Sequence, residues 1–394
     1  MAQRIQTSLR VEGMTCDGCA RHVARALMSV PGVEEAQVPS WQAGRATVVA
    51  QESVADEDLR RAVEAAGYRA VVLEKRPIEG ERRFPPERGA DYDLMVIGGG
   101  SAGFAAAIKG AELGAKVALV EASTIGGTCV NIGCVPSKTL IRAAELCYKS
   151  AYPRFEGLPT CPPPSDWQRV VAQKDELVAA LRQGKYVDVV SVYPSITLLR
   201  GRARLIGGRG VTINGTTYTP GKIILATGSH PWAPPIPGLK EAGFLDSTDA
   251  LSLPALPESL IVIGGGAIGL ELAQLFARFA VQVTVLEAGP RIAATEEPEI
   301  GEALGGYLRE EGLQLHTGVR IARVDRVGGQ YRVEVEGDGS PRTFHAAQLL
   351  VATGRRPTTQ GLGLEAAGVK VVNGAVQVDE ACQTNVPGIY AAGD

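Results

Sequence analysis

The chain has 394 residues, too many for one small module, because domains average roughly 150 residues. Hydrophobic residues make up 45% and charged residues 21% of the sequence, a balance that excludes wholesale disorder. The formal net charge of −3 leaves no general basic surface of the kind that nucleic-acid binding needs, which excludes that class of partner.

Residues 1–74 alternate short β-type runs with amphipathic helical ones, which predicts a compact βαββαβ unit. Within it, Cys16 and Cys19 lie in EGMTCDGCARHV, on a loop that leads into a helix. Two sulfur atoms at this spacing can converge on one soft ion such as Cu(I), Hg(II) or Zn(II) from a single turn of backbone. A redox pair or structural thiols are the alternatives to a metal site.

Residues 75–90, KRPIEGERRFPPERGA, carry charges of both signs and prolines, without an apolar period. This composition is typical of a flexible linker. As a coil it would span on the order of 20 Å.

Two later segments share one pattern: a buried strand, a glycine-rich turn, a helix, and a second strand that ends in an acid. The first copy carries Gly98, Gly100, Gly103 and Glu121, and the second carries Gly264, Gly266, Gly269 and Glu287. Glycine at these positions permits a tight turn and close approach to a pyrophosphate, while the helix N-terminus faces the phosphates. Each copy is followed by a strand ending in Ala-Thr-Gly, at 222–231 and 348–357. The duplication predicts two bound dinucleotides, one permanent and one exchanging.

Between the copies lies TIGGTCVNIGCVPSKTLIRAAEL, with Cys129 and Cys134 in one short loop. Gly133 can bend this loop, and Pro136 stands early in a predicted helix. A helix that begins at Cys134 would stabilise its thiolate through the positive N-terminus. The pair therefore favours redox chemistry over two thiols that happen to be close.

The segment GGTCVNIGCVPSK resembles the redox-disulfide signature of the flavoprotein disulfide reductases, and the resemblance covers residues 92–394. It implies FAD and NADPH or NADH as cofactors. FAD would contact Gly98, Gly100, Ser101, Ala102, Gly103, Glu121, Ser123, Gly127, Thr128, Ala226, Thr227, Gly228 and Asp394. The nicotinamide nucleotide would contact Gly264, Gly266, Gly269, Glu287 and Gly354.

The same resemblance implies the catalytic roles. Cys129 would exchange with substrate and Cys134 would lie against the flavin, with Lys138 and Glu271 as an ion pair beside the ring. A fixed cation there would stabilise negative charge on the reduced cofactor. Tyr186, in LRQGKYVDVV, matches an active-site tyrosine of the mercury-reducing branch, although a buried structural tyrosine is the alternative.

We therefore predict an α/β architecture: two Rossmann-like FAD and NAD(P) domains preceded by a small ferredoxin-like α+β domain. The expected boundaries are 1–74 for the metal-associated domain and 75–90 for the linker. The FAD domain would take 91–243, the NAD(P) domain 244–365, and residues 366–394 would return to the FAD domain.

The segment around Cys16 and Cys19 resembles heavy-metal-associated domains, and its fusion to a disulfide reductase resembles the mercury-reducing branch of that family. This implies reduction of Hg(II) to Hg(0), with Cys16, Cys19, Cys129 and Cys134 as metal ligands and low-molecular-weight thiols as partners. Two alternatives stay open: a dihydrolipoamide dehydrogenase-like enzyme with a metal-binding appendage, and a catalytically silent metal-binding fragment.

Two features depart from the family pattern. Glu287 favours free ribose hydroxyls over a 2′-phosphate, so we expect NADH to serve at least as well as NADPH. The family also continues beyond Asp394 into a domain that builds a dimer. We therefore expect this chain to be a fragment, and a homodimer only if that domain is present.

No run approaches the roughly 20 uninterrupted apolar residues of a membrane span, and MAQRIQTSLR lacks the apolar stretch of a signal peptide. We expect a cytoplasmic protein without a membrane span. In a reducing compartment the two close cysteine pairs indicate metal or redox chemistry before structural disulfides. The other three cysteines, Cys147, Cys161 and Cys382, are expected to be packing or surface residues.

Overall fold

The computed structural model describes residues 4–77, 89–153, 155, 157, 160, 166–336 and 341–394. The chain forms two compact units, Met1–Arg83 and Phe84–Asp394. Within the described ranges, no helix is both long enough and apolar enough to cross a membrane.

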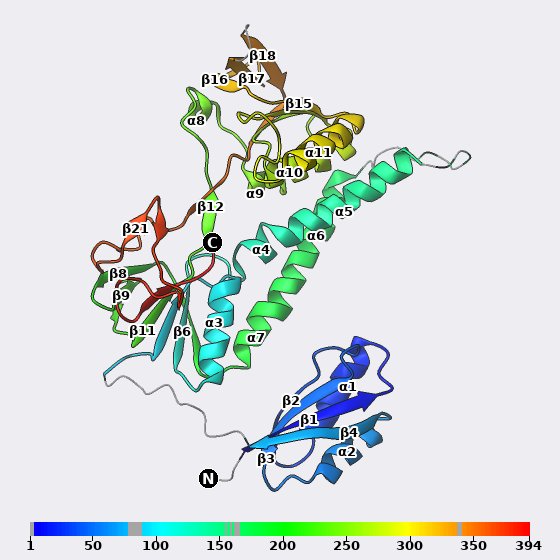
Figure 1. Ribbon diagram of the computed structural model, residues 1–394, viewed down its shortest axis with the longest axis vertical. Helices are drawn as coiled ribbons and strands as arrows, with labels where there is room; N and C mark the ends of the chain where they lie inside the picture. Colours follow the sequence, from blue (N-terminus) through cyan, green and yellow to red (C-terminus); the bar gives the residue numbers. More distant parts are fainter. Residues whose placement is uncertain are drawn as a thin grey trace. The chain divides into compact units, whose positions relative to one another are not determined.

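The first unit is a four-stranded antiparallel sheet of order β2-β3-β1-β4, with two helices (Figure 1). Its elements are β1 (Arg4–Glu12), α1 (Asp17–Met28), β2 (Val33–Gln37), β3 (Arg45–Gln51), α2 (Asp56–Ala65) and β4 (Arg69–Pro77). Val23 and Leu27 of α1 are fully buried with Leu9 and Val48 of the sheet, because i and i+4 share one helix face and alternate strand residues share one sheet face. The predicted βαββαβ unit is confirmed.

The last strand of the first unit extends three residues beyond the predicted boundary at residue 74. Strand β4 runs to Pro77, and its last residues pair with Ile5, Gln6 and Thr7 of β1. Backbone pairing to a central strand therefore places residues 75–77 in the sheet instead of the linker. Residues 78–88 of the predicted linker lie outside the described residues.

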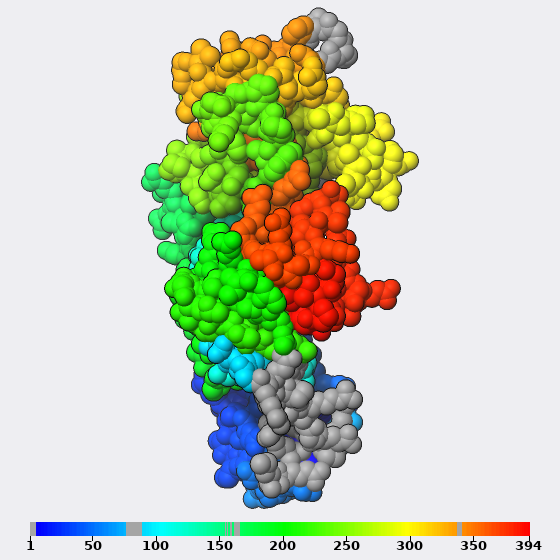
Figure 2. Space-filling model, turned by 90° about the vertical axis from the view of Figure 1, so that its left-hand side faces the viewer, coloured from blue at the N-terminus to red at the C-terminus, as the bar shows by residue number. Residues whose placement is uncertain are grey.

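The second unit contains two parallel sheets, each carrying one glycine-rich turn. The first has the order β23-β11-β5-β6-β7 and consists of β5 (Leu94–Ile97), β6 (Val117–Glu121), β7 (Ile196–Arg200), β11 (Lys222–Leu225) and β23 (Ile389–Ala391). Helix α3 (Ser101–Glu112) connects β5 to β6, the crossover that parallel neighbours require. Strand β23 brings the last residues back beside β11, and the red C-terminal segment lies against green surface in Figure 2.

The second sheet repeats this arrangement with the order β15-β14-β13-β19. It consists of β13 (Ser259–Ile263), β14 (Gln282–Leu286), β15 (Gln314–His316) and β19 (Gln348–Val351), with α10 (Ala267–Arg278) between the first two strands and α11 (Pro298–Glu310) before β15. All its neighbours are parallel, and the central strands are apolar and buried, as expected for a sheet covered on both faces. The predicted internal duplication is confirmed, while the exact domain boundaries stay predictions.

Smaller sheets and short helices extend both folds. The antiparallel additions are β8 (Ala203–Gly207), β9 (Gly210–Ile213) and β10 (Thr216–Tyr218), then β16 (Arg320–Val327), β17 (Gln330–Glu336) and β18 (Arg342–Ala346). Two-stranded sheets are formed by β12 (Ser229–Pro231) with β20 (Arg355–Pro357), and by β21 (Val371–Val372) with β22 (Ala375–Val376). The short helices are α8 (Leu239–Ala242) and α9 (Ser247–Ala250). Strand β12 lies where the chain passes from the first parallel sheet to the second, and β20 lies where it returns. Their pairing therefore joins these two connections.

A pair of long helices links the first parallel fold to the second (Figure 1). The elements of this region are α4 (Gly127–Asn131), α5 (Cys134–Ala151), α6 (Trp167–Arg182), the π-helical turn η1 (Gln183–Val187) and α7 (Asp188–Ser191). Leu140 and Ala144 of α5 and Trp167 of α6 share one buried cluster with Phe276 of α10. The Trp167 indole donates to the Leu253 carbonyl at 2.8 Å. The helix that begins at Cys134 is thus packed against the second dinucleotide fold.

Candidate functional site

The first glycine-rich turn follows β5 and is held by the acid at the end of β6. The Glu121 carboxylate accepts the backbone N–H of Gly99 at 2.9 Å and that of Ser123 at 2.7 Å. Both oxygens are therefore fixed at the carboxyl edge of the parallel sheet, where α/β folds bind ligands. The turn itself leads directly into α3, with Gly100 as its N-cap.

Two glycines of this turn allow segments to approach more closely than a side chain would permit. A Cβ on Gly98, whose φ is +115°, would lie 2.1 Å from the Ala226 carbonyl oxygen. A Cβ on Gly103 would lie 1.9 Å from the carbonyl oxygen of Gly98. The missing Cβ of Gly103 lets α3 pack onto the turn, and Gly103 does not line the cavity described next.

These elements enclose a cavity of about 610 Å³. The sequence-predicted residues that line it are Gly98, Gly100, Ser101, Ala102, Glu121, Ser123, Gly127, Thr128, Ala226, Thr227, Gly228, Asp394, Cys129 and Cys134. Sequence reasoning missed other lining residues: Arg202, Ser229, Thr358, Gln360 and Leu362. Thr358 and Gln360 come just after the second Ala-Thr-Gly strand, which was the one available signal, whereas Arg202 follows β7 without a motif.

Both cysteines line this cavity. Cys134 is the first residue of α5, with Gly133 as N-cap, and Cys129 lies in α4. Both are free thiols. The hydrogen bond to the Cys134 thiol, together with partial burial, raises the pKa of the Cys129 thiol above its ordinary value. An adjacent pair of this kind can interconvert between dithiol and disulfide.

Lys138 lies one turn into α5 and forms an ion pair with Glu271 of α10. The two side chains are 58% and 42% exposed, and neither lines the cavity that holds the cysteines. The contact links α5 to the second dinucleotide fold. A role for Lys138 beside a bound flavin stays a prediction.

Tyr186 lies in η1 and packs on Phe104 of α3, with ring centroids 4.7 Å apart. It belongs to an apolar cluster under the first sheet and does not line the cavity of Cys129 and Cys134. The geometry therefore favours the packing interpretation of Tyr186 over the predicted catalytic one.

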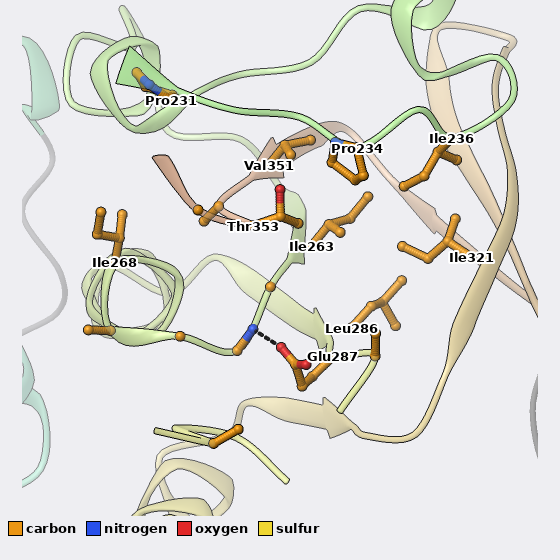
Figure 3. Close-up of a pocket in the computed structure, with 18 of the residues that line it drawn as sticks. Pro231, Pro234, Ile236, Ile263, Ile268, Leu286, Glu287, Ile321, Val351 and Thr353 are labelled. Carbon is orange, nitrogen blue, oxygen red and sulfur yellow. Dashed lines mark hydrogen bonds between the residues drawn. The ribbon is translucent and has the colours of Figure 1, made fainter. Parts of the chain in front are cut away.

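The second glycine-rich turn lines a separate cavity of about 670 Å³. Gly264, Gly266, Glu287 and Gly354 line it, whereas Gly269 supports the turn, since its Cβ would lie 2.1 Å from the Gly264 carbonyl oxygen. Figure 3 shows the Glu287 carboxylate reaching the turn, with apolar side chains from neighbouring segments opposite.

In detail, Glu287 accepts the N–H of Gly265 and that of Gly289, each at 2.6 Å. This is the same arrangement that Glu121 makes with Gly99 and Ser123. The two cavities are therefore built alike, as the duplicated sequence pattern predicted.

The first unit carries the other cysteine pair. Cys16 is the N-cap of α1, and its Sγ lies 3.3 Å from the Sγ of Cys19. A hydrogen bond from the Tyr68 hydroxyl, followed by contributions from Thr15 and Cys16, lowers the pKa of Cys19 to about 6. Within the described ranges, no group of three or more His, Cys, Asp or Glu side chains could hold a metal ion. The geometry fits a two-thiolate site for a soft ion.

We expect Tyr68→Phe to slow alkylation of Cys19 at pH 7 by about three- to tenfold, because loss of the hydroxyl removes the main cause of its lowered pKa. In the unmutated protein the thiolate forms as the pH rises through about 6, and in the variant this rise moves to higher pH. Peptide mass spectrometry after timed iodoacetamide treatment measures the rate. Tyr307→Phe, at an exposed tyrosine of α11, is the matched control. Equal pH profiles for all three proteins would contradict the assigned hydrogen bond.

The remaining cysteines fall as follows. Cys147 is buried in the cluster around α5, Cys382 is exposed, and Cys161 lies outside the described residues.

Comparison with protein families gives two matches. The model of the family described as pyridine nucleotide-disulphide oxidoreductase matches residues 92–394, and that of the heavy-metal-associated domain matches residues 8–69. The two matches fall on the second and first units, respectively.

Curated relatives align along nearly the whole chain. A mercuric reductase of Staphylococcus aureus is 42% identical over 98% of this chain and 69% of its own length. A mercuric reductase of Acidithiobacillus ferrooxidans is 41% identical over 100% of this chain and 71% of its own length.

Among solved structures, an HOCl-induced flavoprotein disulfide reductase of Escherichia coli matches with a TM-score of 0.69 and 33% identity, covering 77% of this chain and 66% of that one. Its Cu(II) complex matches with a TM-score of 0.68 and 33% identity, over 76% of this chain and 65% of that one. The chain thus spans about two thirds of the length of the proteins it matches.

Proposed function

Because the chain belongs to the pyridine nucleotide-disulphide oxidoreductase family and carries a heavy-metal-associated domain, we propose that it reduces Hg(II) to Hg(0) with NAD(P)H. The balanced reaction is NAD(P)H plus Hg(II) giving NAD(P)⁺, one proton and Hg(0). The observation that carries the proposal is the position of Cys129 and Cys134, which together line the cavity built by the first dinucleotide turn.

The residues of that cavity fit FAD. Gly98 and Gly103 let the turn pack closely against Ala226 and α3, where a Cβ would collide with backbone. Glu121 is fixed at the edge where the ribose of a dinucleotide binds. The start of α3 presents its free N–H groups to a pyrophosphate. When bound, FAD supplies two-electron transfer between the nicotinamide and the cysteine pair.

The cysteines take part in two ways. The disulfide accepts two electrons and two protons and opens to two thiols. Those thiols lose their protons to bind Hg(II), since thiolates are ligands that soft ions prefer. Two further electrons from NAD(P)H reduce the bound ion, and neutral Hg(0) leaves because it has little affinity for thiolates.

Lys138 and Glu271 support this chemistry from α5 and α10. Their ion pair fixes a cation one turn from Cys134. We assign Lys138 the role of stabilising negative charge that develops on the reduced ring system. In the first unit, Cys16 and Cys19 bind Hg(II) before reduction. Low-molecular-weight thiols as carriers of the ion, and a homodimer, stay predictions.

We propose that NADH serves at least as well as NADPH. The Glu287 carboxylate is held at the cavity wall by two backbone N–H groups, where it would repel a 2′-phosphate. Arg320 and Arg355 line this cavity, but Arg320 pairs with Glu336 and Arg355 donates to Ser229. Arg291 donates to carbonyls of its own loop.

We expect kcat/KM with NADH to be at least equal to that with NADPH, and Glu287→Gln to raise the NADPH value by about tenfold. Calorimetric titration with ADP-ribose and with its 2′-phosphate compares the two binding affinities directly, without turnover. Glu296→Gln, in the same loop, is the control. A large preference for the 2′-phosphate in the unmutated protein would contradict the role of Glu287.

An acceptor panel tests the proposed function. We expect Hg(II) in excess thiol to support NAD(P)H oxidation at rates that lipoamide, glutathione disulfide and Cu(II) do not approach. Faster oxidation with lipoamide or glutathione disulfide would favour a disulfide reductase with a metal-binding appendage. A colourless protein that consumes NAD(P)H with none of these acceptors would favour a silent metal-binding protein.

A further inference from the structure

Asn131, at the end of α4, holds the loop between the two cysteines in place. Its Nδ2 donates to the carbonyls of Ile125 and Gly127, each at 3.0 Å. Its Oδ1 accepts the Nη1–H of Arg182 at 3.1 Å. Carbonyls can only accept and a guanidinium can only donate, so these partners define a single orientation of the amide.

The segment to which Asn131 is hydrogen-bonded borders the first cavity, which we propose to hold FAD. The N–H of Gly126 donates to the carbonyl of Gly99 at 2.8 Å, which ties this segment to the first glycine-rich turn. Gly127 and Cys129 both line the cavity. The Asn131 amide therefore joins the cysteine loop to the dinucleotide turn through main-chain partners.

Arg182 approaches from a different element. It is the last residue of α6, and the π-helical turn η1 follows it at once. The ring of Tyr186, in that turn, packs on Phe104 of α3. Short π-helical turns occur frequently at functional sites, because the extra residue redirects the side chains that follow. Here the turn fixes the end of α6 against α3, so that Arg182 reaches Asn131 from a rigid base.

We propose that Arg182 is a positioning residue that keeps Cys129 within bonding reach of Cys134 by fixing the Asn131 amide. A disulfide forms only when the two sulfurs meet within narrow geometric limits. A loop fixed by hydrogen bonds meets them more often than a free one, so the disulfide is more stable with Arg182 in place. The inference deepens the proposed function, because it concerns the same pair of thiols.

The test measures the stability of this disulfide directly. The full-length, FAD-loaded protein is equilibrated with mixtures of glutathione and glutathione disulfide, and the Cys129–Cys134 state is read by alkylation and peptide mass spectrometry. In the exchange, the two protein thiols are oxidised to one disulfide and one glutathione disulfide is reduced to two glutathione molecules. We expect Arg182→Met to lower the equilibrium constant for the protein disulfide about tenfold, a potential about 30 mV less negative.

Two further variants are needed: a conservative replacement of Arg182 and a control elsewhere in η1. Arg182→Lys restores one donor, so its constant should lie between those of Arg182→Met and the unmutated protein; if Arg182→Met does not fold, Arg182→Lys decides alone. Lys185→Met, at an exposed lysine of η1, should match the unmutated protein.

An unchanged equilibrium constant in the Arg182 variants, even with a lower melting temperature, would overturn the positioning role. If the unmutated protein forms no Cys129–Cys134 disulfide at any glutathione ratio, the proposed function itself fails. The two failures are therefore distinguishable.

Discussion

Replacing Cys134 by alanine is expected to lower Hg(II)-dependent NAD(P)H oxidation by at least about 1,000-fold, because no second thiol remains to form the disulfide or to share the metal ion. Cys134 starts α5 at the wall of the first cavity, which Cys129 also lines. Cys129→Ala should cause a loss of similar size. Steady-state assays with Hg(II) in excess thiol measure both.

The control for this prediction is Cys382→Ala, at an exposed cysteine outside both cavities, which should keep full activity. The flavin content of all variants should be unchanged, because Cys134 supplies no group that the dinucleotide turn needs. Substantial mercury reduction by Cys134→Ala would contradict the assignment of the pair.

Replacing Gly103 by alanine is expected to give a colourless protein with less than about 1% of the unmutated activity. The new Cβ would lie 1.9 Å from the Gly98 carbonyl oxygen, so α3 must move away from the turn that we propose to hold the pyrophosphate. Overpacking of this kind costs about 1–3 kcal/mol or more and distorts the backbone groups that a ligand needs. The ratio of visible to ultraviolet absorbance measures bound FAD.

Gly306→Ala is the matched control, because Gly306 lies within α11 with nothing near its missing Cβ. That change should stabilise the helix by up to about 1 kcal/mol and leave the flavin bound. Full flavin content in Gly103→Ala would show that α3 tolerates the methyl group and that the close approach is not required.

The sequence predicted those parts of the site that depend on local backbone chemistry. Glycines that permit close contact and a cysteine at a helix start each follow from short-range geometry, so the positions of Gly98 and Cys134 could be predicted. Glu121 was predicted at the same turn, but the N–H groups of Gly99 and Ser123 that its carboxylate accepts were not. The duplicated strand–turn–helix pattern likewise predicted both parallel sheets.

Features that depend on long-range packing were harder to predict from the sequence. Thr358 and Gln360 reach the first cavity only because the chain returns from the second fold, and the Ala-Thr-Gly strand that precedes them does not by itself reveal that return. The Arg182–Asn131 contact joins residues 51 positions apart. The packing of Tyr186 on Phe104 depends on the π-helical turn, which the period of the sequence did not indicate. The extension of β4 to Pro77 depends on pairing with β1.

Anaerobic reductive titration of the oxidised protein is the most direct test of a redox-active cysteine pair beside a flavin. We predict that two electrons per flavin produce a long-wavelength absorbance band, due to a thiolate against the ring, and that Hg(II) then bleaches it. Direct bleaching of the main flavin absorbance by the first two electrons, with no long-wavelength band, would contradict the account.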